Sequence, residues 1–214
     1  MGQRTTVRRG RVVTGRGTAH GTEPPAPRRL RRQERRAAII DGAAAAFAPG
    51  GYKATSMADI AAAAGVSHLI VYRHFDSKEV LYEAVLERAV EHLADALSDD
   101  RAAGTYGPTP GALLDAARLD PSGFGVLWRH ASREPEFALW SDRARSLLAE
   151  VTTSALARHV APDHLSWAVR ATVAYLVEAV LVWVEDGDRR LDDRFVAATN
   201  AALMAGVKSW AAAR

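Results

Sequence analysis

Several residue types are missing or scarce in the 214-residue chain. It has no cysteine, which excludes disulfides, thiolate metal sites and a cysteine nucleophile, and suits a reducing cytoplasm. Isoleucine occurs at only 4 positions against 43 alanines, a balance that favours helices over strands, so we predict an all-α protein. The longest uninterrupted apolar runs, residues 43–48 and 179–184, are far shorter than the roughly 20 residues that cross a bilayer. We therefore expect no membrane span.

Motifs of catalysis are also missing. The seven histidines have no HExxH or other metal-ligand spacing, no GxSxG motif occurs, and residues 206–209 (GVKS) lack the loop that precedes a phosphate-binding lysine. We predict that the protein is not an enzyme and has no catalytic residues, no metal site and no cofactor.

Positive charge is concentrated at the N-terminus. Residues 1–36 carry eleven arginines and two glutamates, a net charge of +9, although the whole chain has only +3. Residues 1–27 include five glycines and three prolines, and they offer neither the apolar stretch of a secretory signal nor an amphipathic transit helix. We predict a disordered basic arm over residues 1–30 that contacts polyanions, with a solubilising tail as the alternative.

The region after the arm has the pattern of three short helices and one long one. A helical period runs from about Arg31 to Ala48. Ser56 is expected to cap a second helix through a capping box with Asp59, and Gly65 to end it in a left-handed conformation. Ser67 is expected to cap a third helix that ends near His74. An amphipathic helix then begins at Asp76 or Ser77, where Glu79 completes a capping box, and continues to about Leu97.

The second and third of these helices form a candidate helix-turn-helix. At 100° per residue, Val71 and Phe75 share one side of the third helix, which we take as its core face. The opposite side carries Leu69, Ile70 and Arg73, with Tyr72 and His74 at the flanks. A helix in a DNA major groove needs this division, with base-reading side chains outward and phosphate-binding groups at the edges.

Residues 39–85, IIDGAAAAFAPGGYKATSMADIAAAAGVSHLIVYRHFDSKEVLYEAV, resemble the DNA-binding domain of the TetR family of bacterial transcriptional repressors. The resemblance lies in Phe47, the Gly51-Tyr52…Thr55 segment, the Asp59-Ile60-Ala61…Ala64-Gly65-Val66-Ser67 turn, Tyr72-Arg73-His74-Phe75 and Ser77-Lys78-Glu79. It implies a helix-turn-helix domain at 31–78 and a larger helical regulatory domain at 79–214. It also implies a cytoplasmic homodimer that binds a palindromic operator on double-stranded DNA and releases it when a small-molecule effector binds.

The resemblance also assigns the DNA contacts. The recognition helix corresponds to residues 67–74, and the phosphate contacts to Tyr72, His74 and Lys78. Leu69 and Ile70 stand where the family usually has small or polar residues, so we expect them to contact thymine methyl groups, with one directional contact from Arg73 or His68. The full set of expected DNA-binding residues is Arg31, Arg32, Ser56, Ser67, His68, Leu69, Ile70, Tyr72, Arg73, His74 and Lys78.

The regulatory half is expected to hold helices near 112–119, 123–132, 137–160, 164–186 and 192–212. Family members bind their ligand between the long fourth helix and the middle of this domain, and dimerise through the last two helices. The candidate ligand-binding residues are His92, Leu93, Phe124, Leu127, Trp128, His130, Phe137, Trp140, Tyr175 and Glu178. Each aromatic residue is equally consistent with core packing. We expect Glu178 to be buried, paired with Arg170 or a partner chain, or facing a ligand that carries a cation or hydrogen-bond donors.

Two other functions are compatible with the sequence. One is a non-specific architectural DNA-binding dimer without an effector. The other is a ligand-binding protein or enzyme that no longer uses DNA.

Overall fold

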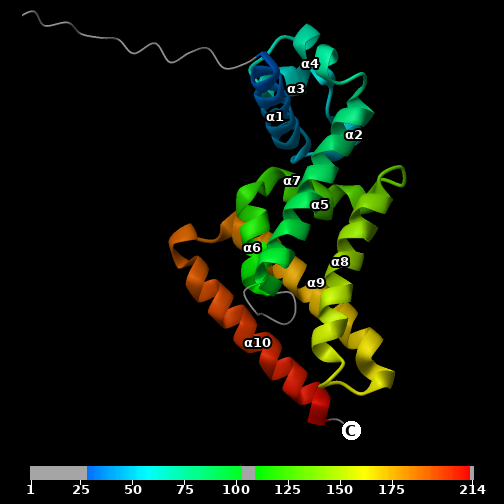
Figure 1. Ribbon diagram of the computed structural model, residues 1–214, viewed down its shortest axis with the longest axis vertical. Helices are drawn as coiled ribbons and strands as arrows, with labels where there is room; N and C mark the ends of the chain where they lie inside the picture. The colour runs from blue at the N-terminus through cyan, green and yellow to red at the C-terminus, as the bar shows by residue number, and fades with distance from the viewer. Residues whose placement is uncertain (1–27, 103–108, 213–214) are drawn as a thin grey trace, which may run out of the picture.

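The computed structural model describes residues 28–102 and 109–212, and within them it contains helices and no strand. The helices of the N-terminal part and the long connecting helix are α1 (Arg28–Phe47), α2 (Gly51–Ala54), α3 (Met57–Ala63), α4 (His68–His74) and α5 (Lys78–Ala102). In Figure 1, α1 to α4 form the upper end of the molecule, and α5 leads from them into the larger helical part below.

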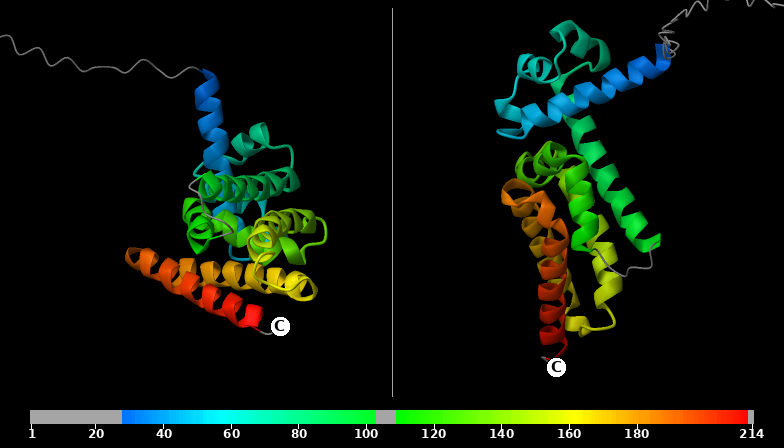
Figure 2. Two further views of the ribbon diagram at one scale, coloured as in Figure 1. Left: turned by 60° about the horizontal axis from the view of Figure 1, so that its bottom comes forward. Right: turned by 90° about the vertical axis from the view of Figure 1, so that its left-hand side faces the viewer.

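The larger part begins with α6 (Pro110–Leu119) and α7 (Pro121–Gly125), followed by a π-helical turn, η1 (Val126–His130), and a 3-10 turn, η2 (Ala131–Arg133). It continues with α8 (Ala138–Leu156), α9 (Pro162–Asp186), the short turn η3 (Arg189–Leu191) and α10 (Asp192–Ala212). Figure 2 shows α9 and α10 side by side as a two-helix layer.

Local sequence signals explain most of the helix ends. Ser56 and Asp59 form the expected capping box of α3, and Gly65 has a φ of 64°, the left-handed value that favours glycine. Ser67 is the N-cap residue of α4, as expected, but its side chain makes no capping hydrogen bond. The hydroxyl of Ser77 accepts a hydrogen bond from the Val80 amide at 3.2 Å and so caps α5. The helix α1 begins at Arg28 rather than Arg31, and the remainder of the predicted arm, residues 1–27, lies outside the described residues.

One apolar core runs through both parts of the molecule. Near the N-terminus it includes Phe47, Val71 and Phe75, and it continues through Tyr82 on α5 to Phe137, directly before α8. A smaller buried cluster lies where α8, α9 and α10 meet, formed by Leu156, Val160, Ala168, Val169 and Val207. The larger core thus joins the short helices to α5 and α8 in one packed body.

Within residues 28–102 and 109–212, α9 is the one helix long and apolar enough, by length and composition, to cross a membrane; its most apolar window has a mean hydropathy of 1.6. The uninterrupted apolar runs of the sequence do not reveal this helix, because charged residues such as Glu178 divide the segment. A single helix of this kind is weak evidence for a membrane span, because the core helix of a soluble protein has the same composition. In this fold α9 packs against α6, α8 and α10.

Candidate nucleic-acid interface

The outer face of α4 is exposed. Val71 and Phe75 are buried in the core as predicted, whereas Leu69 is 71% exposed and Tyr72 45% exposed. Arg73 and His68 are also exposed, and the His68 ring lies edge-on to Tyr72 at 4.8 Å between centroids. Ile70 is half-buried and packs against the core, so it offers less surface than Leu69. The most prominent apolar side chain on this face is therefore Leu69.

Arginines of α1 adjoin the C-terminal end of α4. Arg31, Arg32, Arg35 and Arg36 are all exposed, and the Arg36 guanidinium lies 4.9 Å from the ring centroid of Phe75. Burial lowers the pKa of His74, and the positive charges of Arg32, Arg35, Arg36 and Arg73 lower it further. These charges lie close enough together to attract a polyanion.

Lys78 is held within the chain. Its ammonium donates hydrogen bonds to the carbonyl oxygens of Tyr52 at 2.8 Å and Thr55 at 2.9 Å, and it lies 4.1 Å from the Tyr52 ring centroid. An ammonium has three N–H donors, so one remains for a phosphate. Replacing Lys78 would disturb the loop before α3, and this makes it a poor site for testing DNA contact.

Ser56 and Ser67, the two expected cap residues, are both exposed at helix N-termini. The Ser56 amide and hydroxyl both donate to Asp59 Oδ2, at 2.8 Å and 2.6 Å, and these bonds lower the pKa of Asp59. The Ser67 hydroxyl has no capping bond and can face a phosphate.

Three polar contacts join the helices of the N-terminal part and α5 to η1 and to the residue after η2. Glu134, which directly follows η2, accepts hydrogen bonds from the Tyr52 amide at 2.8 Å and from the Tyr82 hydroxyl at 2.5 Å. His130 Nε2 lies 2.9 Å from the Ala48 carbonyl oxygen. Burial and the hydrogen bond with Glu134 raise the pKa of Tyr82. The turns η1 and η2 are thus tied to the segment that links α1 to α2.

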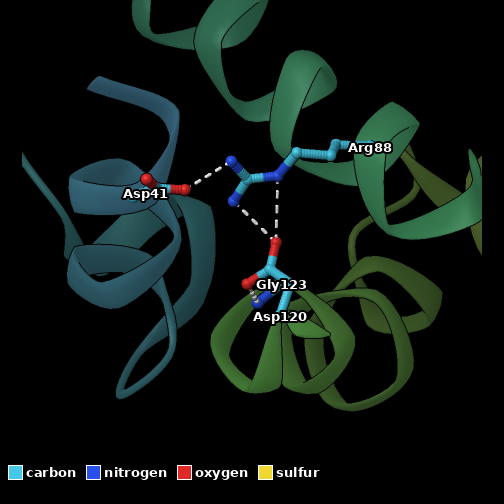
Figure 3. A network of polar contacts seen from close by, with 4 residues as sticks. All are labelled: Asp41, Arg88, Asp120 and Gly123. Carbon is cyan, nitrogen blue, oxygen red and sulfur yellow. Dashed lines mark hydrogen bonds and ion pairs between the residues drawn. The ribbon is translucent and has the colours of Figure 1, made fainter. Parts of the chain in front are cut away.

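A second junction is centred on Arg88 of α5 (Figure 3). Its guanidinium donates to Asp120 Oδ2 from Nε at 3.0 Å and from Nη2 at 2.6 Å, and to Asp41 Oδ1 from Nη1 at 2.5 Å. Asp120 is buried and also accepts the Gly123 amide at 2.8 Å, so it caps α7. A single arginine therefore connects α1, α5 and α7.

The structure distributes the candidate ligand residues over several places. Four of them, Leu93, Phe124, Leu127 and Phe137, are buried in the apolar core. Trp140 is half-buried against that core, His130 contacts Ala48, and His92 lines an acidic cleft between α5 and α6. Tyr175 lines a groove between α9 and α10.

Trp128 and Glu178 are brought together in a cleft of about 420 Å³ formed by η1, α8 and α9. The expectation that Glu178 is buried is wrong: its side chain is exposed at this cleft. Glu178 forms no ion pair with Arg170, because the two residues are eight positions apart on one helix, about 12 Å along its axis.

Large apolar side chains remain exposed on α9. Trp167, Tyr175 and Val182 recur at intervals of eight and seven residues and so lie on one stripe of the helix. The neighbouring groove of about 310 Å³ includes Gly206 and Trp210 of α10. Within one chain, α9 therefore keeps an uncovered apolar stripe.

The sequence did not reveal the roles of three polar residues: Glu134 and Arg145 were not singled out, and Arg170 was considered only as a partner of Glu178. Glu134 acts on Tyr52, 82 positions earlier, and no local spacing signals such a contact. Arg145 and Arg170 line the cleft beside Trp128, where the sequence predicted Glu178 as the charged ligand-binding residue. In the described residues, no group of three or more histidine or acidic side chains is placed to hold a metal ion.

Comparison with known proteins agrees with this architecture. The family model described as "Bacterial regulatory proteins, tetR family" matches residues 39–85. The HTH-type transcriptional activator FasR of Mycolicibacterium smegmatis is 40% identical over 93 residues, which are 44% of this chain and 40% of that protein. The chain thus spans less than half the length of this relative.

Longer matches have lower identity. The HTH-type transcriptional repressor AcnR of Corynebacterium efficiens is 28% identical over 140 residues, 64% of this chain and 72% of that protein. The crystal structure of a TetR-like transcriptional regulator from Rhodococcus sp. RHA1 aligns with a TM-score of 0.65 at 23% identity, covering 85% of this chain and 97% of that one. Residues 39–85, which hold the helix-turn-helix described above, thus match the DNA-binding domain of the TetR family, and the helices that follow share the fold of a TetR-like regulator.

Proposed function

We propose that this protein is a cytoplasmic, effector-responsive transcriptional regulator, acting as a repressor, that binds a palindromic operator as a homodimer. TetR-family proteins are DNA-binding regulators rather than enzymes. The relatives include an activator and repressors by name, and the proposal of a repressor rests on the latter.

The observation that carries the proposal is that α4 has one side buried in the core and an opposite side exposed to solvent. Its core side is anchored by Val71 and Phe75, while Leu69, Tyr72 and Arg73 face outward beside the exposed arginines of α1. Within the described residues nothing covers Leu69, and packing inside the chain gives no reason for an apolar side chain at this exposed position. In a major groove it would contact thymine methyl groups, and the flanking groups would bind phosphates.

Dimerisation is supported by the apolar stripe of α9 and the groove beside it. A second copy covering this stripe would remove Trp167, Tyr175 and Val182 from water. A dimer with two-fold symmetry would present two α4 helices to half-sites about 34 Å apart, one turn of DNA.

Effector response is supported by the cleft at Trp128. Trp128 belongs to η1, and the same turn contacts Ala48 through His130. A ligand that shifts η1 and α5 would change the spacing of the two α4 helices. A 100-fold loss of DNA affinity needs a coupling free energy of about 2.7 kcal/mol, which is within the usual range for allostery.

The experiment that tests the proposal selects bound sequences from random duplex DNA and measures affinity for the selected site and for a scrambled duplex. We expect a palindromic site and a large preference over the scrambled duplex. Leu69→Ala should reduce this preference, whereas Leu119→Ala, which removes an equally exposed leucine on α6, should leave it unchanged. If both variants retain the preference, α4 is not the reading helix.

A non-specific architectural dimer is the second candidate, and the apolar character of Leu69 and Ile70 favours it, because these side chains form no hydrogen bonds with bases. Competition with random DNA distinguishes the two. If random DNA competes for the protein as effectively as the selected site does, the protein binds DNA without sequence preference and is architectural.

A further inference from the structure

The cleft between α8, α9 and η1 has predominantly apolar walls and a charged rim. It has a volume of about 420 Å³, and the residues that line it include Trp128, Arg145, Arg170, Val173, Val177 and Leu181. Its size is that of a small-molecule site, and such sites combine apolar walls with a few polar groups that orient the ligand.

The rim of the cleft carries more positive than negative charge. Its charged lining residues are two arginines, Arg145 and Arg170, and a single carboxylate, Glu178. Nη1 of Arg145 donates to Ser141 and Asp142 on its own helix at 3.2 Å and 3.3 Å. Arg170 is exposed and forms no ion pair within residues 28–102 and 109–212. An anion entering the cleft can therefore bind Arg170 without displacing an existing partner.

Trp128 adds a hydrogen-bond donor without a partner. The side chain is only 7% exposed, and its indole N–H has no hydrogen-bond partner. A buried donor without an acceptor is unfavourable, and a ligand oxygen that accepts from it removes that cost. The Arg145 guanidinium lies 5.8 Å from the Trp128 ring centroid, so a cation and the unpaired donor adjoin one another.

We propose that this cleft binds a small amphipathic carboxylate. The carboxylate lies at Arg170 and Arg145 and accepts from the Trp128 indole, while the apolar body lies against Val173, Val177 and Leu181. The inference rests on the proposed effector response, and it replaces the sequence-based hypothesis of a cationic ligand held by a buried Glu178. Because Glu178 is exposed to water and two arginines line the same cleft, it gives a cation little advantage.

The test compares three probes with the same ten-carbon chain and different head groups: decanoate, decan-1-ol and decyltrimethylammonium. Binding to the full chain is measured by calorimetry without DNA. We expect decanoate to bind about fivefold more tightly than decan-1-ol, as for one partly exposed charge contact, and decyltrimethylammonium to bind most weakly. Arg170→Gln should lower decanoate affinity towards that of decan-1-ol, with Arg145 still present, and leave decan-1-ol binding unchanged. Arg143→Gln, an exposed arginine of α8 that does not line the cleft, is the matched control.

A second readout follows the indole N–H itself. In the proton–nitrogen NMR spectrum, the indole signal that Trp128→Phe removes should move downfield on adding decanoate, while the other four tryptophan signals move less. Equal affinity for the three probes, tightest binding of decyltrimethylammonium, or an unmoved Trp128 signal overturns the inference. If one of these results is found in a protein that still prefers its selected DNA, only the ligand proposal fails and the proposed regulator stands. If the protein shows no preference for its selected DNA in the absence of every probe, the proposed function itself fails.

Discussion

The hydroxyl of Tyr82 donates a 2.5 Å hydrogen bond to Glu134, 52 positions later in the chain. The other carboxylate oxygen of Glu134 accepts the Tyr52 amide, and the rings of Tyr52 and Tyr82 lie 5.3 Å apart. Glu134 thus fixes the long helix α5 and the start of α2 to the turns of the regulatory part. Together with the contact of His130 with Ala48, this carboxylate connects the larger helical part of the molecule to its N-terminal helices.

Removing one donor should weaken this connection measurably. Tyr82→Phe keeps the ring contacts with Phe47 and Phe137 but leaves one oxygen of Glu134 unpaired. We expect a loss of about 1–3 kcal/mol in the free energy of unfolding, measured by urea denaturation. Glu134→Gln should cost at least as much, because its amide NH2 must face one of the two donors.

The matched control for these variants is Glu136→Gln, two positions away and exposed. Its effect should stay within about 0.5 kcal/mol. If Glu134→Gln is as mild as Glu136→Gln, the bridge contributes nothing to stability.

Gly51 should tolerate alanine less well than Gly65. Both have left-handed φ values, 72° and 64°. At Gly65 an added Cβ meets no atom within 4 Å, so Gly65→Ala should cost only the conformational term of about 1–2 kcal/mol. At Gly51 the Cβ would lie 2.7 Å from Glu134 Oε1 and 3.0 Å from His130 Nδ1, so the destabilisation should be larger.

Gly125 serves as the opposite control. It has helical backbone angles and no atom within 4 Å of an added Cβ, so Gly125→Ala should stabilise the fold by about 0.5–1 kcal/mol. If Gly51→Ala and Gly65→Ala destabilise the protein equally in thermal or urea unfolding, then Glu134 and His130 do not restrict the space at Gly51.

The two carboxylates that bind Arg88 should differ in importance. Asp120 is buried and Asp41 is largely exposed. Asp120→Asn should lower stability by about 1.5–3 kcal/mol, since it leaves the charge of Arg88 without its buried partner. Asp41→Asn should change stability by about 0–1 kcal/mol, as for other exposed ion pairs. Urea denaturation of both variants gives the comparison, and a reversed order would contradict the assignment.

The residues 1–27 should strengthen DNA binding without selecting its sequence. Their basic composition predicts an arm that contacts polyanions, and they lie outside the described residues. We expect their deletion to weaken binding to selected and scrambled DNA alike. The slope of log affinity against log salt should fall by about 0.9 for each phosphate that the arm neutralises in the intact protein. An unchanged slope would mean that the arm does not bind DNA.

The sequence predicted the fold well wherever a helix end carries its own chemical signal. The capping box of Ser56, the left-handed Gly65 and the inward pair Val71 and Phe75 all lie where their spacing placed them. The short helix α2 could not be predicted because four residues are too few to reveal a helical period. Ser67 failed as a side-chain cap because an N-cap position does not by itself impose the hydroxyl rotamer.

The regulatory site was harder to predict, because its residues meet only through tertiary packing. Periodicity showed that α9 is apolar on nearly all sides but not which side faces α8, so it placed Glu178 inside rather than at the cleft rim. Aromatic residues such as Phe124 and Phe137 are good candidates for both a pocket and a core, and packing put them in the core. No pattern in the sequence distinguishes an aromatic residue that lines a cleft from one that is buried in the core.

Binding of DNA should depend on pH through His74. Burial and the neighbouring arginines lower its pKa below the usual 6.5, so in the free protein His74 is neutral at pH 7.5. Phosphates beside His74 would favour the charged ring and raise its pKa in the complex. DNA affinity should therefore increase as the pH falls through the window between the bound and free pKa values, by at most tenfold per pH unit for one proton, and then level off. Fluorescence anisotropy with a labelled operator between pH 5.5 and 8 measures this.

The same histidine should act on stability with the opposite sign. Because its folded pKa is depressed, the unfolded chain binds a proton first, and stability should decrease as the pH falls below about 6.5. His74→Gln should flatten both pH profiles. His68→Gln, which replaces an exposed histidine on the same helix, is the matched substitution for comparison. If His74→Gln retains the full pH dependence of DNA affinity, His74 does not contact phosphate, and the protonation that drives binding belongs to another group on this face.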